Sequence, residues 1–199
     1  MPFFSDTGTG GFEPKRKFRF LVSFTALGNL TFMAKTAAKP SYDMTPTEHN
    51  VLNHVFKFPG IIKWSDVDIT FIDAVEPNVG SKFYNALRNS GYVEPLSEAA
   101  LVTGITKVGS AAACGEVIIK QLDGGGISLP AGVDPGDVTS TLTEATNVVD
   151  KWTLKNAFIK SVKFGDGLDY SSEDLVDVAV TLTYDYASYD GTILPHLTE

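Results

Sequence analysis

Hydrophobic and polar residues alternate most regularly near the end of the chain, over 175–186. Side chains of a strand change face at every residue, so this alternation predicts one long strand with a buried face and a wet face. Strands usually run about 5 to 6 residues, and a longer one with a wet face suits a barrel or the lumen of an assembly. The predicted inward residues are Val176, Val178, Val180, Leu182, Tyr184 and Tyr186, and the outward ones are Asp177, Ala179, Thr181, Thr183 and Asp185.

Alternation predicts further strands in the first half of the chain. Residues 17–25 and 30–36 are predicted as two strands joined by a tight turn, so we expect a first hairpin there. Residues 61–73 are predicted as one strand. Its inward residues are Val67, Ile69 and Phe71, and its outward residues are Asp66, Asp68 and Thr70.

A second predicted strand pair follows, over 115–123 and 147–159. Three glycines, at 124–126, begin the connection between these strands. Residues 127–146 are rich in loop-forming residues and show no core face. They are therefore predicted as an insertion that projects from the tip of the hairpin.

One helix is predicted, over about 77–90, and residues 97–114 stay open between a loose helix and a connector. The strand-dominated pattern with one flanking helix predicts a mainly β fold with long loops, an antiparallel β-sandwich or half-open β-barrel. The predicted landmarks of the helix are the N-cap Asn78, the buried face of Val79, Phe83 and Leu87, and the stop at Gly91.

Two segments carry apolar residues without core periodicity. Residues 1–14 are rich in Gly, Thr and Ser and predict an extended N-terminal arm. Residues 39–60 predict a long loop or an extended hairpin, and loops of this length are uncommon unless they have a role. We expect this segment to dock onto another subunit, with candidate contact residues at Tyr42, Val51, Leu52, Val55, Phe56 and Phe58.

Length and composition describe an ordinary soluble chain. Its 199 residues predict a single domain, 1–199, and 43% hydrophobic residues without a run of about 18 apolar ones predict no membrane anchor. The N-terminus lacks a signal-peptide pattern, so synthesis and folding in the cytoplasm are expected. The lone Cys114 has no disulfide partner in the chain and is interpreted as a packing residue.

The formal net charge of -8 disfavours a protein that binds nucleic acid, since phosphate binding depends on clustered Lys and Arg. The one basic cluster, at 15–19, opens an alternating strand and is interpreted as a solvated or intersubunit edge. An acidic wall serves DNA in a different way, as a conduit that repels phosphates.

No arrangement of residues indicates catalysis, and no cofactor or metal is expected. His49 and His54 share a face of neither a helix nor a strand, and His196 is distant in sequence. The carboxylate pairs are explained by a strand face and a turn, and the glycine-rich segments at 8–11 and 124–126 lack the context of a phosphate cradle. The carboxylate pairs are Asp66 with Asp68 and Asp166 with Asp169.

Trp64 and Trp152 are predicted to begin strands, as core or interface residues.

Four segments, in this order and spacing, carry a resemblance to a known family. They are KWSDVDITFID (63–73), the helix with Phe83, Tyr84 and Leu87, DKWTLKNAFIKSVKFGDGLDYSS (150–172), interpreted as a hairpin, and LVDVAVTLTYDYA (175–187). The chain resembles the tail tube proteins of contractile-tailed bacteriophages, which are related to tailocin and type VI secretion inner-tube proteins.

The resemblance implies a structural protein of the virion tail, assembled in the host cytoplasm. It implies hexameric rings whose sheets join into one closed β-barrel and that stack into the inner tube. The candidate contact residues of 39–60 would then be inter-ring contacts. The implied partners are the tail sheath, baseplate and tail terminator proteins. Double-stranded DNA would pass through the lumen without specific binding during genome ejection. The candidate lumen-facing residues are Asp177, Thr181, Thr183 and Asp185, although a plain solvent-facing surface also explains them.

Three alternatives stay open at the level of sequence. Two of them, a tube-like baseplate or tail-end component and a tailocin or secretion-system inner tube, differ from the tail tube in setting. The third, a monomeric ligand-binding β-sandwich, belongs to a different class and is distinguished by polymerisation.

Overall fold

The computed structural model describes residues 15–28, 30, 33–96, 102, 104–122, 148–165, 167–171 and 173–191. The predicted arm at 1–14 and the predicted insertion at 127–146 lie outside these residues, as do Asp166, His196 and the glycines at 124–126. The elements are β1 (Phe20–Phe24), β2 (Ala34–Ala37), β3 (Tyr42–Val51), β4 (His54–Trp64), β5 (Val67–Ile72), α1 (Val79–Asn89), α2 (Lys107–Cys114), β6 (Val117–Leu122), β7 (Val148–Lys155), β8 (Phe158–Phe164), β9 (Asp177–Thr183) and β10 (Tyr186–Gly191).

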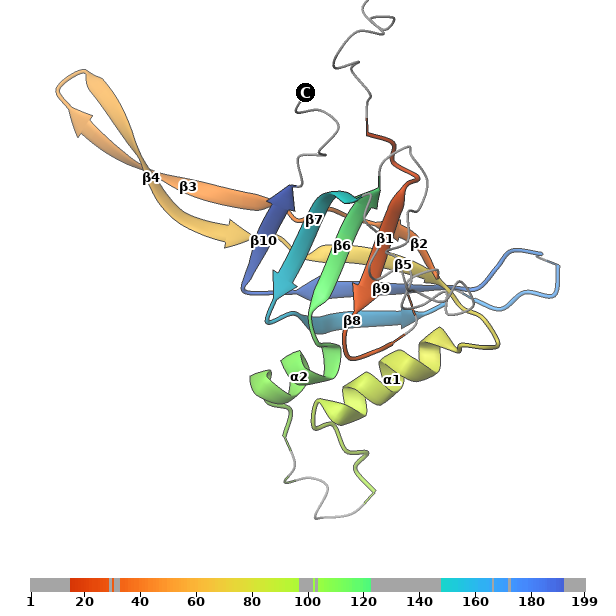
Figure 1. The fold of residues 1–199 in the computed structure, drawn as a ribbon. Coiled ribbons are helices and arrows are strands. Elements are labelled where there is room, and N and C mark those ends of the chain that lie inside the picture. The colour runs from red at the N-terminus through yellow and green to blue at the C-terminus, as the bar shows by residue number, and fades with distance from the viewer. Residues whose placement is uncertain are drawn as a thin grey trace, which may run out of the picture.

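Two four-stranded antiparallel sheets, ordered β1-β6-β7-β10 and β2-β5-β9-β8, face each other with their strands crossed (Figure 1). Within the described residues neither sheet closes into a barrel. Both sheets turn their apolar residues to one core, which confirms the prediction of a mainly β, antiparallel fold. The largest fully buried side chains include Phe71, Phe83, Leu30, Ile69, Leu154 and Leu182.

The predicted first hairpin is wrong, because its two strands lie in different sheets. β1 pairs with β6, with Phe20 opposite Gln121, whereas β2 pairs with β5, with Ala34 opposite Phe71. The turn after Phe24 carries the chain from one sheet to the other. Both strands bury apolar residues in the same core from opposite sides, so their alternation looks like that of a hairpin.

The long predicted strands at 147–159 and 175–186 are each broken at a corner between the sheets. β7 passes into β8 at Asn156, which has a left-handed φ of 56°, and β9 passes into β10 at Asp185. The corners are adjacent, because the Asp185 amide donates to the Lys155 carbonyl at 3.1 Å. For the same reason 150–172 is not a hairpin, whereas the predicted pairing of 115–123 with 147–159 is present as β6 with β7. The predicted strand at 61–73 is likewise split, between β4 and β5.

Helix α1 begins and ends as predicted. The Asn78 side chain accepts a hydrogen bond from the Ser81 amide at 2.5 Å, and Gly91, with φ of 109°, follows its C-terminus. Val79 and Phe83 are buried, but Leu87 is more than one-third exposed. The open segment 97–114 contains a second helix, α2, which ends at the buried Cys114. Both helices lie at one end of the sandwich, close to β8 (Figure 1).

The segment predicted as a loop or extended hairpin is the hairpin β3–β4, which projects far from the body (Figure 1). All ten residues of β3 are exposed. At its root, Trp64 contacts the rings of Tyr42 at 5.4 Å and Tyr184 at 6.0 Å between centroids. The hairpin is thus anchored at one end and uncovered along its length.

Candidate functional site

The outer face of the sheet β2-β5-β9-β8 carries three of the four candidate lumen residues. In β9, Val178, Val180 and Leu182 are buried as predicted, so Asp177, Thr181 and Thr183 point to the opposite face. This face stays in contact with solvent, because no helix or strand among the described residues covers it (Figure 1).

Polar side chains on this face are bonded across strands. The Thr181 hydroxyl donates to Asp68 at 2.7 Å, and the Thr183 hydroxyl donates to Asp66 at 2.7 Å. Lys160 of β8 donates to the second oxygen of Asp66 at 2.5 Å. The carboxylate pair Asp66 and Asp68 is therefore held by two threonines and a lysine.

These contacts fix the charge state of the face. Hydrogen bonds from Lys160 and then from Thr183 lower the pKa of Asp66, and the Asp66 carboxylate raises the pKa of Lys160. At the end of β9, Asp177 accepts from Lys35 of β2 at 2.5 Å. Asp66 and Asp177 are thus each paired with an ammonium group, and the face is less acidic than the β9 sequence by itself indicates.

Asp185, the fourth candidate lumen residue, lies apart from this face at the corner between β9 and β10. It accepts two hydrogen bonds from Lys107 of α2, at 2.7 and 2.8 Å, and one from Asn156 at 2.9 Å. The hydrogen bond from Lys107 is the main reason that the pKa of Asp185 is lowered. The alternation grouped Asp185 with the other three because it does not reveal where the chain leaves the sheet.

The hairpin β3–β4 carries a run of exposed apolar side chains along both of its strands. Leu52 at its tip is 97% exposed, and Phe56 and Phe58 on β4 are more than half exposed. An isolated two-stranded hairpin is at best marginally stable in water, and an exposed apolar surface of this size indicates a protein partner. All six candidate inter-ring residues are exposed, and Met44, Ile61 and Ile62, which the sequence reasoning missed, extend the set.

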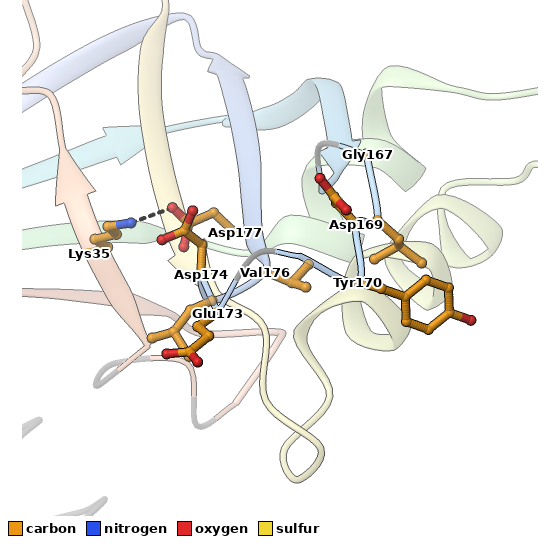
Figure 2. Close-up of a pocket in the computed structure, with 10 residues that line it drawn as sticks. Lys35, Gly167, Asp169, Tyr170, Glu173, Asp174, Val176 and Asp177 are labelled. Carbon is orange, nitrogen blue, oxygen red and sulfur yellow. Dashed lines mark hydrogen bonds and ion pairs between the residues drawn. The ribbon is translucent and has the colours of Figure 1, made fainter.

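A second exposed segment, the connection between β8 and β9, lies at the opposite end of the same sheet. The hairpin leaves at the end where Val67 pairs with Leu182, and this connection enters where Ile72 pairs with Asp177. It borders an open cavity of about 910 Å³, and Figure 2 shows Lys35 bonded to Asp177 among the residues that line it. Leu168 is 90% exposed. The sequence predicts part of this segment as the end of a hairpin at 150–172 and explains its aspartates by a turn.

The described residues offer no site for catalysis by a metal or a thiol. Within them, no group of three or more His, Cys, Asp or Glu side chains could hold a metal ion. His49 and His54 lie on opposite strands of the exposed hairpin. Burial raises the pKa of the Cys114 thiol to about 12, which keeps it protonated. No helix in the described part of the chain has the length and apolar character to cross a membrane.

The two tryptophans lie differently from the prediction that each begins a strand. Trp64 ends β4 and Trp152 lies within β7. Both are partly buried and pack against the core. The structure therefore supports the core interpretation of both residues.

Tyr184 carries a buried hydroxyl that has no hydrogen-bond partner among the described residues. Burial, with a smaller effect of the Asp66 charge, raises its pKa to about 12. Tyr184→Phe keeps the ring against Trp64 and removes the unsatisfied group. We expect the free energy of unfolding to rise by up to about 1 kcal/mol, and the thermal midpoint by about 2–4 °C, in circular dichroism melts. A lower midpoint would contradict this assignment.

Solved structures share this fold at low sequence identity. The chain is similar to one in the tube-terminating cap of the anti-feeding prophage, with a TM-score of 0.60, 16% identity, and 92% of this chain and 95% of that chain covered. A chain of the anti-feeding prophage baseplate gives 0.59 and 15%, covering 92% and 99%. The sheath-tube complex of an extracellular contractile injection system gives 0.56 and 15%, covering 90% and 93%. The chain shares the fold of these injection-system components.

No family model and no curated protein matches the chain. The contractile-system fold covers nearly the whole described sandwich, so it accounts for both sheets together. The likeness to a chain of the sheath-tube complex agrees with the fold that the resemblance implies.

Proposed function

We propose that the protein is a structural, non-enzymatic subunit that polymerises as stacked hexameric rings into the inner tail tube of a contractile phage tail. The observation that carries the proposal is the open sheet β2-β5-β9-β8, which ends in two edge strands and bears a bonded polar face. The fold shared with injection-system components supports it.

Ring closure follows from the edges of this sheet. Strands at an edge expose backbone donors and acceptors that invite pairing with another chain. β2 of one copy pairs with β8 of the next, and a head-to-tail contact of this kind closes by rotation into a ring. Beside β8 lies a largely apolar groove lined by Leu87, Ile105, Phe158, Val162 and Phe164, which the neighbouring copy covers.

Ring stacking follows from the opposite positions of the two exposed segments. The hairpin β3–β4 leaves one end of the sheet, and the β8–β9 connection occupies the other. Copies stacked head to tail bring the hairpin of one ring against the body of the next. Leu52, Phe56 and Phe58 are then buried, together with the other candidate inter-ring residues.

The bonded polar face lines the lumen in this arrangement, and DNA passes it during genome ejection without specific binding. The sheath surrounds the tube, and baseplate and terminator proteins meet its ends.

The substitution Asp177→Lys tests the lumen assignment. Asp177 lies on the polar face and pairs with the half-exposed Lys35 among the described residues, so the variant should still assemble. The infectivity of particles should fall by at least about tenfold, because a cationic ring retains phosphates. Plating efficiency measures this, with Asp177→Asn as control. Normal infectivity of the lysine variant would contradict the assignment of this face to the lumen.

Negative-stain electron microscopy of the purified protein at rising concentration tests the proposal. Hollow tubes with a regular axial repeat are expected, with sixfold symmetry in end-on views. A protein that stays monomeric at every concentration in light scattering would overturn it and favour the ligand-binding sandwich.

A tube-like end component is the second candidate, and similarity to the cap and baseplate structures favours it. Such a component forms single rings that stop without stacking. The same micrographs therefore separate it from the main tube subunit, whereas a tailocin or secretion-system tube differs only in its biological setting.

A further inference from the structure

A buried carboxylate, Asp150 on β7, lies where separate segments of the chain meet. Its side chain is 6% exposed, and one oxygen accepts from Lys15 and from the Tyr189 hydroxyl, each at 2.6 Å. The other oxygen accepts from Lys39 at 3.3 Å. Lys15 precedes β1, and Lys39 lies between β2 and the projecting hairpin. One carboxylate therefore holds both the N-terminal segment and the root of the hairpin.

Gln121 joins the same two segments beside it. This residue is opposite Asp150 in the register of β6 and β7. Its side-chain oxygen accepts from Lys39 at 2.5 Å, and its amide group donates to the Arg16 carbonyl at 3.2 Å. Asp150 and Gln121 therefore form a small hydrogen-bond network on the sheet β1-β6-β7-β10, to which the two segments are attached.

The charges indicate that the network holds the hairpin more than it stabilises the body. Burial by itself would raise the pKa of Asp150, but hydrogen bonds from Lys15, Tyr189 and Lys39 outweigh it and lower the pKa, so the group is ionised at neutral pH. Lys15 and Lys39 are about half exposed and regain water when the carboxylate is neutralised. Losing these hydrogen bonds therefore loosens the two segments that carry Lys15 and Lys39 more than it destabilises the core.

We propose that Asp150 is a positioning residue for assembly, which latches the N-terminal segment and the hairpin root at one point and so sets the direction of the hairpin. Trp64, packed on Tyr42 and Tyr184, holds the root at a second point. A ten-residue strand spans about 33 Å, so a rotation of about 10° at the root moves the tip by about 6 Å. The effect on ring stacking rests on the proposed function, whereas the direction of the hairpin does not.

Distances between two spin labels test the latch in the monomer. Asn53→Cys at the hairpin tip and Asn85→Cys on α1 place the labels on exposed positions, and the buried Cys114 stays unlabelled. We expect one narrow distance distribution in the labelled protein, and at least a twofold broader one after Asp150→Asn or Lys39→Met. Lys155→Met, which removes the ion pair with Glu116 from the other end of β7, serves as the matched control and should keep the narrow distribution.

The variants keep the proposal falsifiable. If Asp150→Asn fails to fold, Lys39→Met decides, because it removes one half-exposed arm. Distance distributions of equal width in Lys39→Met and in the control Lys155→Met would contradict the proposed role of Asp150. In assembly, both latch variants should need at least tenfold more protein to form tubes, and unchanged assembly would also overturn the positioning role. Failure of the unmodified protein to assemble counts against the proposed function alone, since the monomer distances still decide the latch.

Discussion

Replacing Phe56 and Phe58 together with Asp is expected to abolish tube formation and leave the monomer folded. Both rings lie on β4 and are more than half exposed, so neither contributes to the core. Burial of a Phe side chain contributes about 1.5–3 kcal/mol, so losing two per contact weakens it by roughly 3–6 kcal/mol, or about 10²- to 10⁴-fold. The charge that each Asp carries into the contact adds to this loss.

Light scattering and electron microscopy across a concentration series measure this effect. The matched control is the double substitution with Leu, which keeps an apolar surface and should still assemble. Circular dichroism melts should show the same midpoint for the Asp and Leu variants. If the Asp variant formed tubes of normal length at the usual concentration, the hairpin would not be part of the contact between rings.

Phe71→Ala is expected to cost about 3–5 kcal/mol of unfolding free energy, the largest effect of any single substitution considered. Phe71 on β5 is fully buried, and its ring centroid lies 5.4 Å from that of Phe83 and 5.9 Å from that of Phe24. The substitution leaves a cavity between strands of both sheets and α1. The free energy of unfolding of such a domain is roughly 5–15 kcal/mol, so the variant would keep little stability.

Urea denaturation followed by tryptophan fluorescence measures this cost. Phe164→Ala is the control, because its ring is more than half exposed, and we expect a loss under about 1 kcal/mol. Similar midpoints for Phe71→Ala and the unmodified protein would mean that the three-ring cluster is not a structural centre of the core.

The faces of β9 could be predicted from the sequence, but the sheet that each strand joins could not. Val176 and Tyr186, predicted to point inward, lie outside β9 and are exposed. Alternation correctly separated Val178, Val180 and Leu182 from Asp177 and Thr181, since side-chain direction is a local property. Which sheet a strand joins depends on distant pairing. β1 and β2 were therefore placed together, and Asp185 was grouped with residues that lie beyond a corner. Both sheets share one core, so the pattern of buried residues continues across each change of sheet.

Two other features needed the structure for different reasons. Helix α2 is built from Gly, Ser and Ala, which give a weak amphipathic signal, so 97–114 stayed undecided. The hairpin β3–β4 contains Pro46 and Pro59 opposite each other, and proline is typical of edge strands and loops alike. Asp150 lies in a strand whose alternation gave no hint that the N-terminal segment and the hairpin root meet there.

The adjacent corners at Asn156 and Asp185 have a mechanical consequence. Each carries the main chain directly from one sheet into the other, and the two corners are hydrogen-bonded to each other at 2.9 Å. Tension applied along β8 or β9 therefore reaches β7 or β10 through peptide bonds as well as through side-chain packing. A load on one layer is shared by the second layer, and sliding one sheet over the other requires the corners to yield first.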